Sequence, residues 1–163
     1  MLSRLHVKNY VLIDSLEIDF PEGLIIITGQ TGAGKSILLG ALSLVTGAKA
    51  DASMVSEGAD NCVVEAEFDT KDVSIKEILE ENEAEWDEGH LIIRRVVNRS
   101  GRSRAFVNDS PVPVTVLQDI SSRLIDIHSQ HQTLLLSDRQ FQLDILDYYA
   151  GNMELRKECA SAW

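Results

Sequence analysis

The chain has 163 residues, of which 44% are hydrophobic and 25% are charged, and its formal net charge is −11. This length supports one core and one domain, and the acidic balance argues against a broadly basic surface that coats nucleic acid. The opening MLSRLHVKNY lacks the apolar core of a secretory signal and no apolar run reaches membrane-spanning length, so we expect no membrane partner. Cys62 and Cys159 form no CxxC pair, which favours reduced thiols in a cytosolic protein.

Two half-exposed strands are predicted at the start of the chain. Leu5 and Val7 alternate with polar residues in the first strand, and residues 16–20 alternate in the same way in the second. The turn Pro21-Glu22-Gly23 then leads into a continuous apolar run at residues 24–27. Such a run predicts a strand that is covered on both faces.

The stretch GQTGAGKS follows this run and matches the phosphate-binding pattern G-x-x-x-x-G-K-[ST] in full. Glycines allow turns that point successive N–H groups at phosphate oxygens, and the helix that follows adds its positive N-terminal end. Lys35 is expected to act on the β- and γ-phosphates as a catalytic group, and the Ser36 hydroxyl to ligate Mg²⁺. The predicted nucleotide-binding residues are Gly29, Gln30, Thr31, Gly32, Ala33, Gly34, Lys35, Ser36 and Ile37.

Apolar residues then recur at helical spacing up to Val45, and Gly47 is well placed to end that helix. Residues 47–60 are small and polar and predict a loop, from which Lys49 and Ser53 could approach a nucleotide. Alternation predicts a further strand at residues 62–68. Residues 74–86 have near-helical apolar spacing, with glutamates that form a solvated face.

Residues 90–109, HLIIRRVVNRSGRSRAFVND, consist of two β-like runs that predict a hairpin around Ser100-Gly101. The basic residues of this hairpin are Arg94, Arg95, Arg99, Arg102 and Arg104. A local positive patch in an acidic protein raises the hypothesis of contact with the DNA backbone. Pairing with the nearby acidic helix and contact with a partner lobe are the alternatives.

Short helices are predicted at residues 114–123 and 138–149, and a polar helical tail follows. A P-loop hydrolase also needs a carboxylate after an apolar strand to hold Mg²⁺, and another acid to polarise the attacking water. Only weak candidates are present: Asp126 follows just two apolar residues, and Asp144 and Asp147 lie in the helix-like stretch. No LSGGQ-like segment is found. The sequence thus predicts a phosphate-binding motif without the further residues that ATP hydrolysis needs.

Four segments together resemble the RecN family, the bacterial DNA-repair ATPases of the SMC group within the ABC-type ATPases. They are LSRLHVKNYVLIDSLEIDF, ITGQTGAGKSILLGALSLVTGAKAD, NRSGRSRAFVND and LIDIHSQHQTLLL. Many families share the P-loop, whereas GRSRAFVN followed by DIHSQHQ is a narrower signature. The resemblance runs from Leu2 to about Ala150.

This resemblance implies an α/β fold, that of a P-loop NTPase of ABC/SMC head type. The chain would be the N-terminal lobe, with a β-rich edge sheet and a nucleotide-binding core sheet. Residues 1–150 would form the N-terminal half of the head, and residues 151–163 would start a coiled-coil arm. The C-terminal half would carry the signature motif and the acidic Walker B residues, so this chain alone is expected to be inactive as an ATPase.

By the same resemblance, Gln130 in HSQHQ matches the catalytic Q-loop position. Its amide could accept a hydrogen bond from a Mg²⁺-bound water, completing a metal site with Ser36, or orient the attacking water. A surface glutamine in a polar loop is the alternative. His128 and His131 have no third ligand nearby and make a poor zinc site. Asn9 and Tyr10 resemble the segment near the base in SMC-type heads.

The function implied by the resemblance is that of an ATPase in DNA double-strand-break repair and recombination, located in the bacterial cytoplasm and associated with the nucleoid. Its cofactors would be ATP and Mg²⁺. Its partners would be the C-terminal half of the same protein, a second head across sandwiched ATP in a homodimer, and DNA. A self-contained P-loop kinase or NTPase acting on a small molecule is the main alternative, and a structural domain with a vestigial nucleotide grip is the other.

Overall fold

A computed structural model describes residues 1–28, 33–87, 89–125 and 127, and, near the C-terminus, residues 143, 146–147, 149–152, 155–156 and 158–159. The chain divides into two compact units, Met1–Asp126 and Ile127–Trp163. In the second unit, most of the described residues are helical, and Arg156 Nη1 lies 3.4 Å from a carboxylate oxygen of Asp147. The helix predicted at residues 138–149 falls largely outside the described residues, and the predicted coiled-coil arm stays a prediction.

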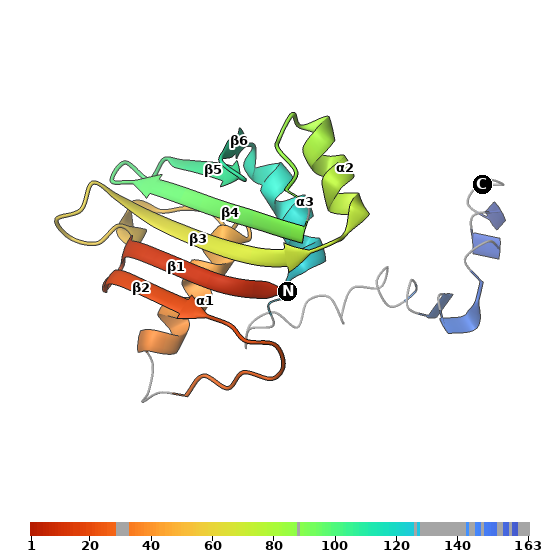
Figure 1. The fold of residues 1–163 in the computed structure, drawn as a ribbon, viewed down its shortest axis with the longest axis horizontal. Coiled ribbons are helices and arrows are strands. Elements are labelled where there is room, and N and C mark those ends of the chain that lie inside the picture. The colour runs from red at the N-terminus through yellow and green to blue at the C-terminus, as the bar shows by residue number, and fades with distance from the viewer. Residues whose placement is uncertain are drawn as a thin grey trace. The chain divides into compact units, whose positions relative to one another are not determined.

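The first unit is built on a six-stranded antiparallel sheet with the order β2-β1-β3-β4-β5-β6 (Figure 1). The strands are β1 (Leu2–Tyr10), β2 (Ile13–Asp19), β3 (Asn61–Thr70), β4 (Gly89–Asn98), β5 (Ser103–Val107) and β6 (Ser110–Val112). The two strands predicted at the start of the chain are therefore confirmed as β1 and β2. The hairpin predicted around Ser100-Gly101 is confirmed as β4 and β5. Strand β3 joins the two hairpins, because it pairs with both β1 and β4.

Helices cover one face of the sheet, where the hydrophobic core lies. The helices are α1 (Ala33–Val45), α2 (Val73–Glu81) and α3 (Val114–Leu124), with a short 3₁₀ helix η1 (Ala52–Met54). Figure 1 shows α1 and α3 behind the strands. Fully buried side chains from the sheet, such as Phe68 and Ile93, form one cluster with Leu44 of α1 and Leu117 of α3. Each such buried side chain stabilises the folded state by roughly 1.5–3 kcal/mol. This gain explains why the alternating apolar pattern located these elements correctly.

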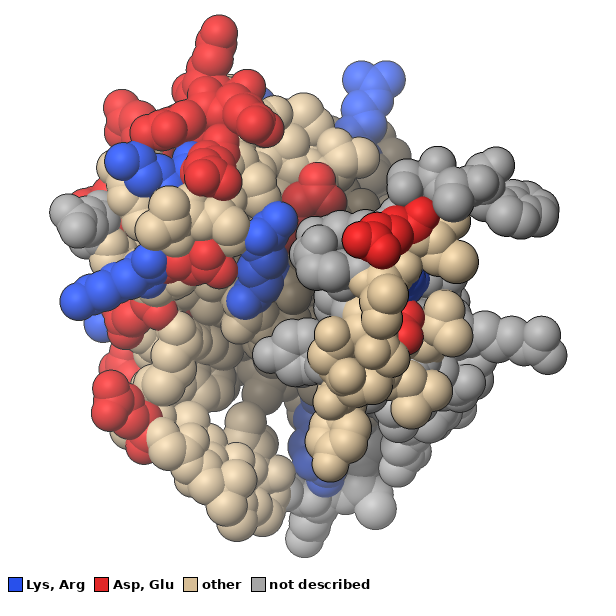
Figure 2. Space-filling model, turned by 90° about the vertical axis from the view of Figure 1, so that its right-hand side faces the viewer, with Lys and Arg blue, Asp and Glu red and all other residues tan. Residues whose placement is uncertain are grey.

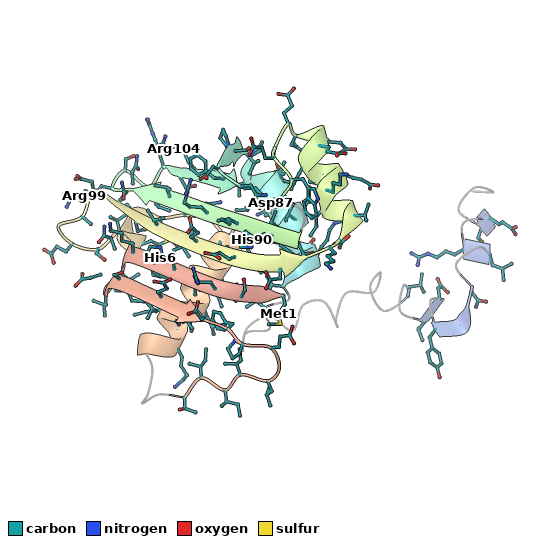
Figure 3. The ribbon with its side chains drawn as sticks, viewed as in Figure 1. Met1, His6, Asp87, His90, Arg99 and Arg104 are labelled. Atoms are coloured by element: carbon teal, nitrogen blue, oxygen red, sulfur yellow. The ribbon has the colours of Figure 1, made fainter. Side chains whose placement is uncertain are left out.

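The opposite face of the sheet carries a network of ion pairs. Arg4 Nε lies 2.8 Å from a carboxylate oxygen of Asp19, and Arg4 Nη1 lies 3.6 Å from one of Glu67. The His90 ring lies within 4 Å of Glu67 and Asp69, and Figure 3 shows His6 and His90 on this face. The Arg4, Asp19 and Asp69 side chains are largely exposed, so this face is a solvated surface rather than a second core, and its ion pairs each contribute little to stability.

Helix α2 is shorter than predicted. It starts after Asp72, whose carboxylate accepts from Ser74 Oγ at 2.6 Å and from Ser74 N at 2.9 Å; these two bonds, the side-chain one first, lower the pKa of Asp72. It ends at Glu81, and Glu83 takes a left-handed φ of 56°. Trp86 therefore lies beyond the helix, because positive φ interrupts helical geometry whatever the apolar spacing predicts.

The apolar run at residues 24–27 is not the covered strand that the sequence predicts. These residues form no strand, Leu24 is 90% exposed and Ile26 is 75% exposed. A continuous apolar run needs neighbours on both faces, and no described residue of this chain supplies them. The described residues accordingly form the edge sheet, whereas residues 24–27, which we assigned to the core sheet, are exposed and form no strand.

The end of α1 is held by a side chain from α3. Gln118 Nε2 donates to the Gly47 carbonyl at 2.9 Å, and Gly47 has a φ of 100°, as a helix-ending glycine requires. A Cβ added to Gly47 would lie 2.4 Å from Gln118 Cγ. The predicted helix end at Gly47 is thus confirmed, with a constraint that the sequence does not reveal.

We expect Gly47→Ala to lower the free energy of unfolding by at least about 2 kcal/mol, because the strained φ and the overlap with Gln118 add. Chemical denaturation measures this loss. Gly58→Ala is the matched control: Gly58 has a φ of 88° but nothing within 4 Å of an added Cβ, so it reports the φ cost alone. Equal losses in the two variants would contradict a role for Gln118.

Candidate nucleotide-binding site

The first turn of α1 has the properties expected of a phosphate-binding helix end. Gly34, Lys35 and Ser36 are exposed, and the turn contains no acidic residue. A Cβ added to Gly34 would meet nothing within 4 Å, so open space lies beside the backbone. The next turn is partly buried at Ile37 and buried at Leu38, which anchors the helix on the sheet. The polar end of α1 is therefore exposed, as a site for an anionic group requires.

A hollow of about 210 Å³ lies next to this turn. It is lined by Ile27, Lys35, Leu38, Leu39 and Leu42. Nucleotide-sized ligands usually occupy pockets of roughly 300–1,000 Å³. This hollow is smaller than such a pocket, and its apolar lining would suit a protein segment as well as a ligand.

The structure describes only part of the predicted site. Ala33, Gly34, Lys35, Ser36 and Ile37 lie together at the start of α1. The other predicted ligands, Gly29, Gln30, Thr31, Gly32 and Gln130, lie outside the described residues, as do Asp126, His128, His131 and Asp144. Asp147 is described in the second unit, where Arg156 already pairs with its carboxylate.

The loop after α1 is tied to the β1–β2 turn. Val11 N donates to the Met54 carbonyl at 2.9 Å, and Ser56 N donates to the Asn9 carbonyl at 3.0 Å. The Ser53 side chain, and then Ser53 N, which donates to Asp51 at 2.8 Å, lower the pKa of the Asp51 carboxyl by hydrogen bonding to it. Lys49 is exposed. A nucleotide contact by Lys49 or Ser53 stays a prediction.

The sequence analysis did not predict that Tyr10 packs against α1. Its side chain is 4% exposed, and burial raises the pKa of its hydroxyl. A Cβ added to Gly40, in the middle of α1, would lie 2.8 Å from the Tyr10 hydroxyl oxygen. The sequence signal was a glycine inside a helix, which often marks a close approach of another group.

The five hairpin arginines do not form one patch. Arg95 is 1% exposed on the core side and donates through Nη2 to Ser103 Oγ at 2.8 Å. Its Nε and Nη1 have no hydrogen-bond partner within the described part of the chain, and burial lowers its pKa. Arg94 is paired with Glu65 and Asp109 and lies over the Phe106 ring. Arg95 is therefore packed on the core side of β4, and Arg94 is held in ion pairs on the opposite face.

The other three arginines lie on the surface near the hairpin turn. Arg99, Arg102 and Arg104 are exposed, and Figure 3 places Arg99 and Arg104 at the end of the sheet where β4 and β5 join. Arg99 Nε donates to the Ala59 carbonyl. A hollow of about 370 Å³ there is lined by Asn61, Val96, Asn98, Arg102, Ser103 and Arg104.

Acidic side chains gather elsewhere. Figure 2 shows them at the top of the view, the end at which α2 lies in Figure 1. The exposed acids of α2 and the following loop are Glu77, Glu80, Glu81, Glu83, Glu85 and Asp87. Among the described residues, the ion pair of α2 is internal, between Lys76 and Glu80, and no hairpin arginine pairs with this helix. The net charge of −11 therefore hides an uneven distribution.

Comparison with known proteins identifies relatives over the whole chain. Residues 4–157 match the family model described as an AAA domain. DNA repair protein RecN of Vibrio cholerae is 40% identical over 164 residues, which cover 100% of this chain and 29% of that protein. RecN of Rickettsia bellii is 39% identical over 167 residues, with 100% and 30% covered. The chain thus spans under a third of the length of these curated relatives.

Solved structures show the same fold. An SMC head domain with an extended coiled coil, bound to the C-terminal domain of ScpA, from Pyrococcus furiosus, aligns with a TM-score of 0.69 and 21% identity. The alignment covers 99% of this chain and 46% of that one. An SMC ATPase studied for ATP-driven dimerization and DNA-stimulated activation aligns with a TM-score of 0.65 and 22% identity, covering 88% and 98%.

These alignments confirm the α/β fold of the SMC head type. Among the described residues, no helix is both long and apolar enough to cross a membrane. The chain belongs to the AAA domain family, and the part of the RecN proteins that it matches is their N-terminal part.

Proposed function

We propose that this chain is the ATP-binding N-terminal part of an SMC-like ATPase that acts in DNA double-strand-break repair and recombination. The observation that carries the proposal is the first turn of α1, where Lys35 and Ser36 of a complete P-loop motif are exposed. The relatives of this chain are named DNA repair proteins, which supports the role in repair. Because DNA is the implied substrate, we place the protein in the bacterial cytoplasm with the chromosome.

The described residues fit a nucleotide with Mg²⁺. Lys35 would hold the β- and γ-phosphates, Ser36 would ligate the metal, and the amides at the start of α1 would donate to phosphate oxygens. Open space at Gly34 and the absence of acid in the first turn agree with an anionic ligand. ATP supplies the phosphoanhydride bond whose cleavage drives such proteins, and Gln130 would orient the attacking water.

Hydrolysis would require the C-terminal part of the same protein, with its Walker B acids and signature motif. Two observations support that partner. The chain spans 29–30% of the length of its relatives, and the apolar residues 24–27 are exposed, with Ile27 lining the hollow beside Lys35. Such apolar surface normally marks an interface. Two completed heads would then form a homodimer around sandwiched ATP, and hydrolysis would separate them.

The test compares this chain with the protein at its natural full length. We expect the chain alone to bind Mg²⁺–ATP weakly and to hydrolyse almost none. The full-length protein should hydrolyse ATP, at a rate that rises with DNA. A phosphate-release assay measures both. Robust turnover by residues 1–163 alone would contradict the proposal and favour a self-contained P-loop enzyme.

DNA contact through Arg102 and Arg104 is a separate prediction. We expect Arg102→Glu with Arg104→Glu, in the full-length protein, to weaken duplex DNA binding by at least about tenfold. The slope of log affinity against log salt should fall by roughly two, because each lost phosphate contact removes about 0.9. Lys71→Glu with Lys76→Glu is the matched control, since it changes the net charge equally through residues that are also exposed. Lys71 follows the far end of β3 from the hairpin turn. Equal effects of the two pairs would contradict a local contact.

A further inference from the structure

We infer that Tyr10 is a positioning residue for the metal-binding turn of α1, acting through its contact with Gly40. This inference rests on the proposed function, because it concerns the Mg²⁺ ligand Ser36. Tyr10 ends β1 and its side chain is 4% exposed. The hydroxyl oxygen would be 2.8 Å from a Cβ at Gly40, while the ring carbon Cζ would be 3.8 Å away. The phenol therefore abuts the helix at a place where only glycine leaves room.

The contact lies one helical turn after the predicted metal ligand, Ser36. Gly40 and Ser36 are four residues apart in α1, so they occupy the same face of the helix, separated by one turn of about 5.4 Å. A helix is stiff over this distance. A displacement of α1 at Gly40 would therefore move the Ser36 hydroxyl by a similar amount.

The backbone around Tyr10 is strained in a way that keeps the side chain inside. Inward residues Leu5 and Val7 alternate along β1, so Asn9 would be next, but Asn9 has a φ of 52° and Tyr10 is buried instead. Val11 also has a φ of 52°, which is rare for a β-branched residue. Strained residues persist only where their surroundings fix them, and they cluster at functional sites.

The surroundings that fix this turn are identifiable. Val11 N and the Asn9 carbonyl are both hydrogen-bonded to the loop at residues 54–56, and Asn9 Nδ2 donates to the Asn61 carbonyl at 3.3 Å. Tyr10 itself forms an isolated bridge with Val55. The β1–β2 turn, the loop after α1 and the start of β3 thus hold Tyr10 as a fixed support for α1.

The test exchanges volume between the two residues in the full-length protein. Gly40→Ala should weaken Mg²⁺–ATP binding by about tenfold, the size of effect typical when the support of a metal ligand is disturbed. Affinity for ATP in EDTA should fall by less, because Lys35 and the amides of the first turn move with the helix but the metal contact of Ser36 plays no part. Adding Tyr10→Phe should restore binding, because the nearest ring atom would then be 3.8 Å from the new methyl group. Fluorescent ATP titrations, with and without Mg²⁺, measure these affinities.

Two further variants complete the design. Ser43→Ala is the control for helix propensity on the same helix, and it should bind Mg²⁺–ATP normally. Tyr10→Leu shortens the support without overpacking it, and it should also weaken Mg²⁺–ATP binding. This variant keeps the inference testable if Gly40→Ala fails to fold. Normal Mg²⁺–ATP affinity in both Tyr10→Leu and Gly40→Ala would overturn the inference, even if their melting temperatures fell. The inference would also be overturned if Gly40→Ala alone and Gly40→Ala combined with Tyr10→Phe lost the same Mg²⁺–ATP affinity. If the unmodified protein bound no ATP, the proposed function would fall, and the inference with it.

Discussion

Lys35→Ala is expected to weaken Mg²⁺–ATP binding by about 100-fold and to abolish hydrolysis by the full-length protein. The ammonium group would otherwise make charge-assisted bonds to the β- and γ-phosphates, which are among the strongest hydrogen bonds in proteins. Because the Lys35 side chain is exposed at the start of α1, its removal should leave the fold intact. Calorimetric titration measures the affinity, and thermal unfolding checks the fold.

Lys71→Ala is the control for this substitution. Lys71 is also exposed and follows β3, outside the P-loop motif. The control should retain most of the binding. Unchanged affinity in Lys35→Ala would contradict the assignment of the first turn of α1 as the phosphate site.

Leu24→Asp with Ile26→Asp is expected to have opposite consequences in the two lengths of the protein. In residues 1–163 alone, both side chains are already exposed, so unfolding should be unchanged and self-association should decrease. In the full-length protein, where we propose that the C-terminal part covers them, the loss should be at least about 3 kcal/mol, since two apolar contacts are lost and two charges are buried. Denaturation of both lengths measures the difference.

Val73→Asp is the matched control for this pair. Val73 is 66% exposed and starts α2. An acid in the first turn of a helix is well tolerated, so this variant should be neutral in both lengths. If Leu24→Asp with Ile26→Asp were also neutral in the full-length protein, the proposed covering of residues 24–27 would be wrong.

Much of the fold could be predicted because its signals are local. The alternation around Leu5 and Val7, the apolar spacing from Ile37 to Val45 and the turn at Gly101 each reflect backbone geometry within a few residues. The P-loop motif is local in the same sense, and it placed Lys35 and Ser36 at the start of a helix. Local patterns failed where a tertiary partner was required. Residues 24–27 have the composition of a buried strand, but no described neighbour pairs with them.

The sequence by itself determined the alternating faces of β1 to β5, the phosphate-binding motif and the similarity to RecN. Only the tertiary structure decided that Arg95 is buried while Arg104 is exposed, that Gln118 holds Gly47, and that Tyr10 abuts Gly40. The physical reason is that periodicity specifies which face of an element is apolar, whereas contacts between distant residues depend on strand register and helix placement. Those are set by the packing of the whole unit, and no short segment contains them.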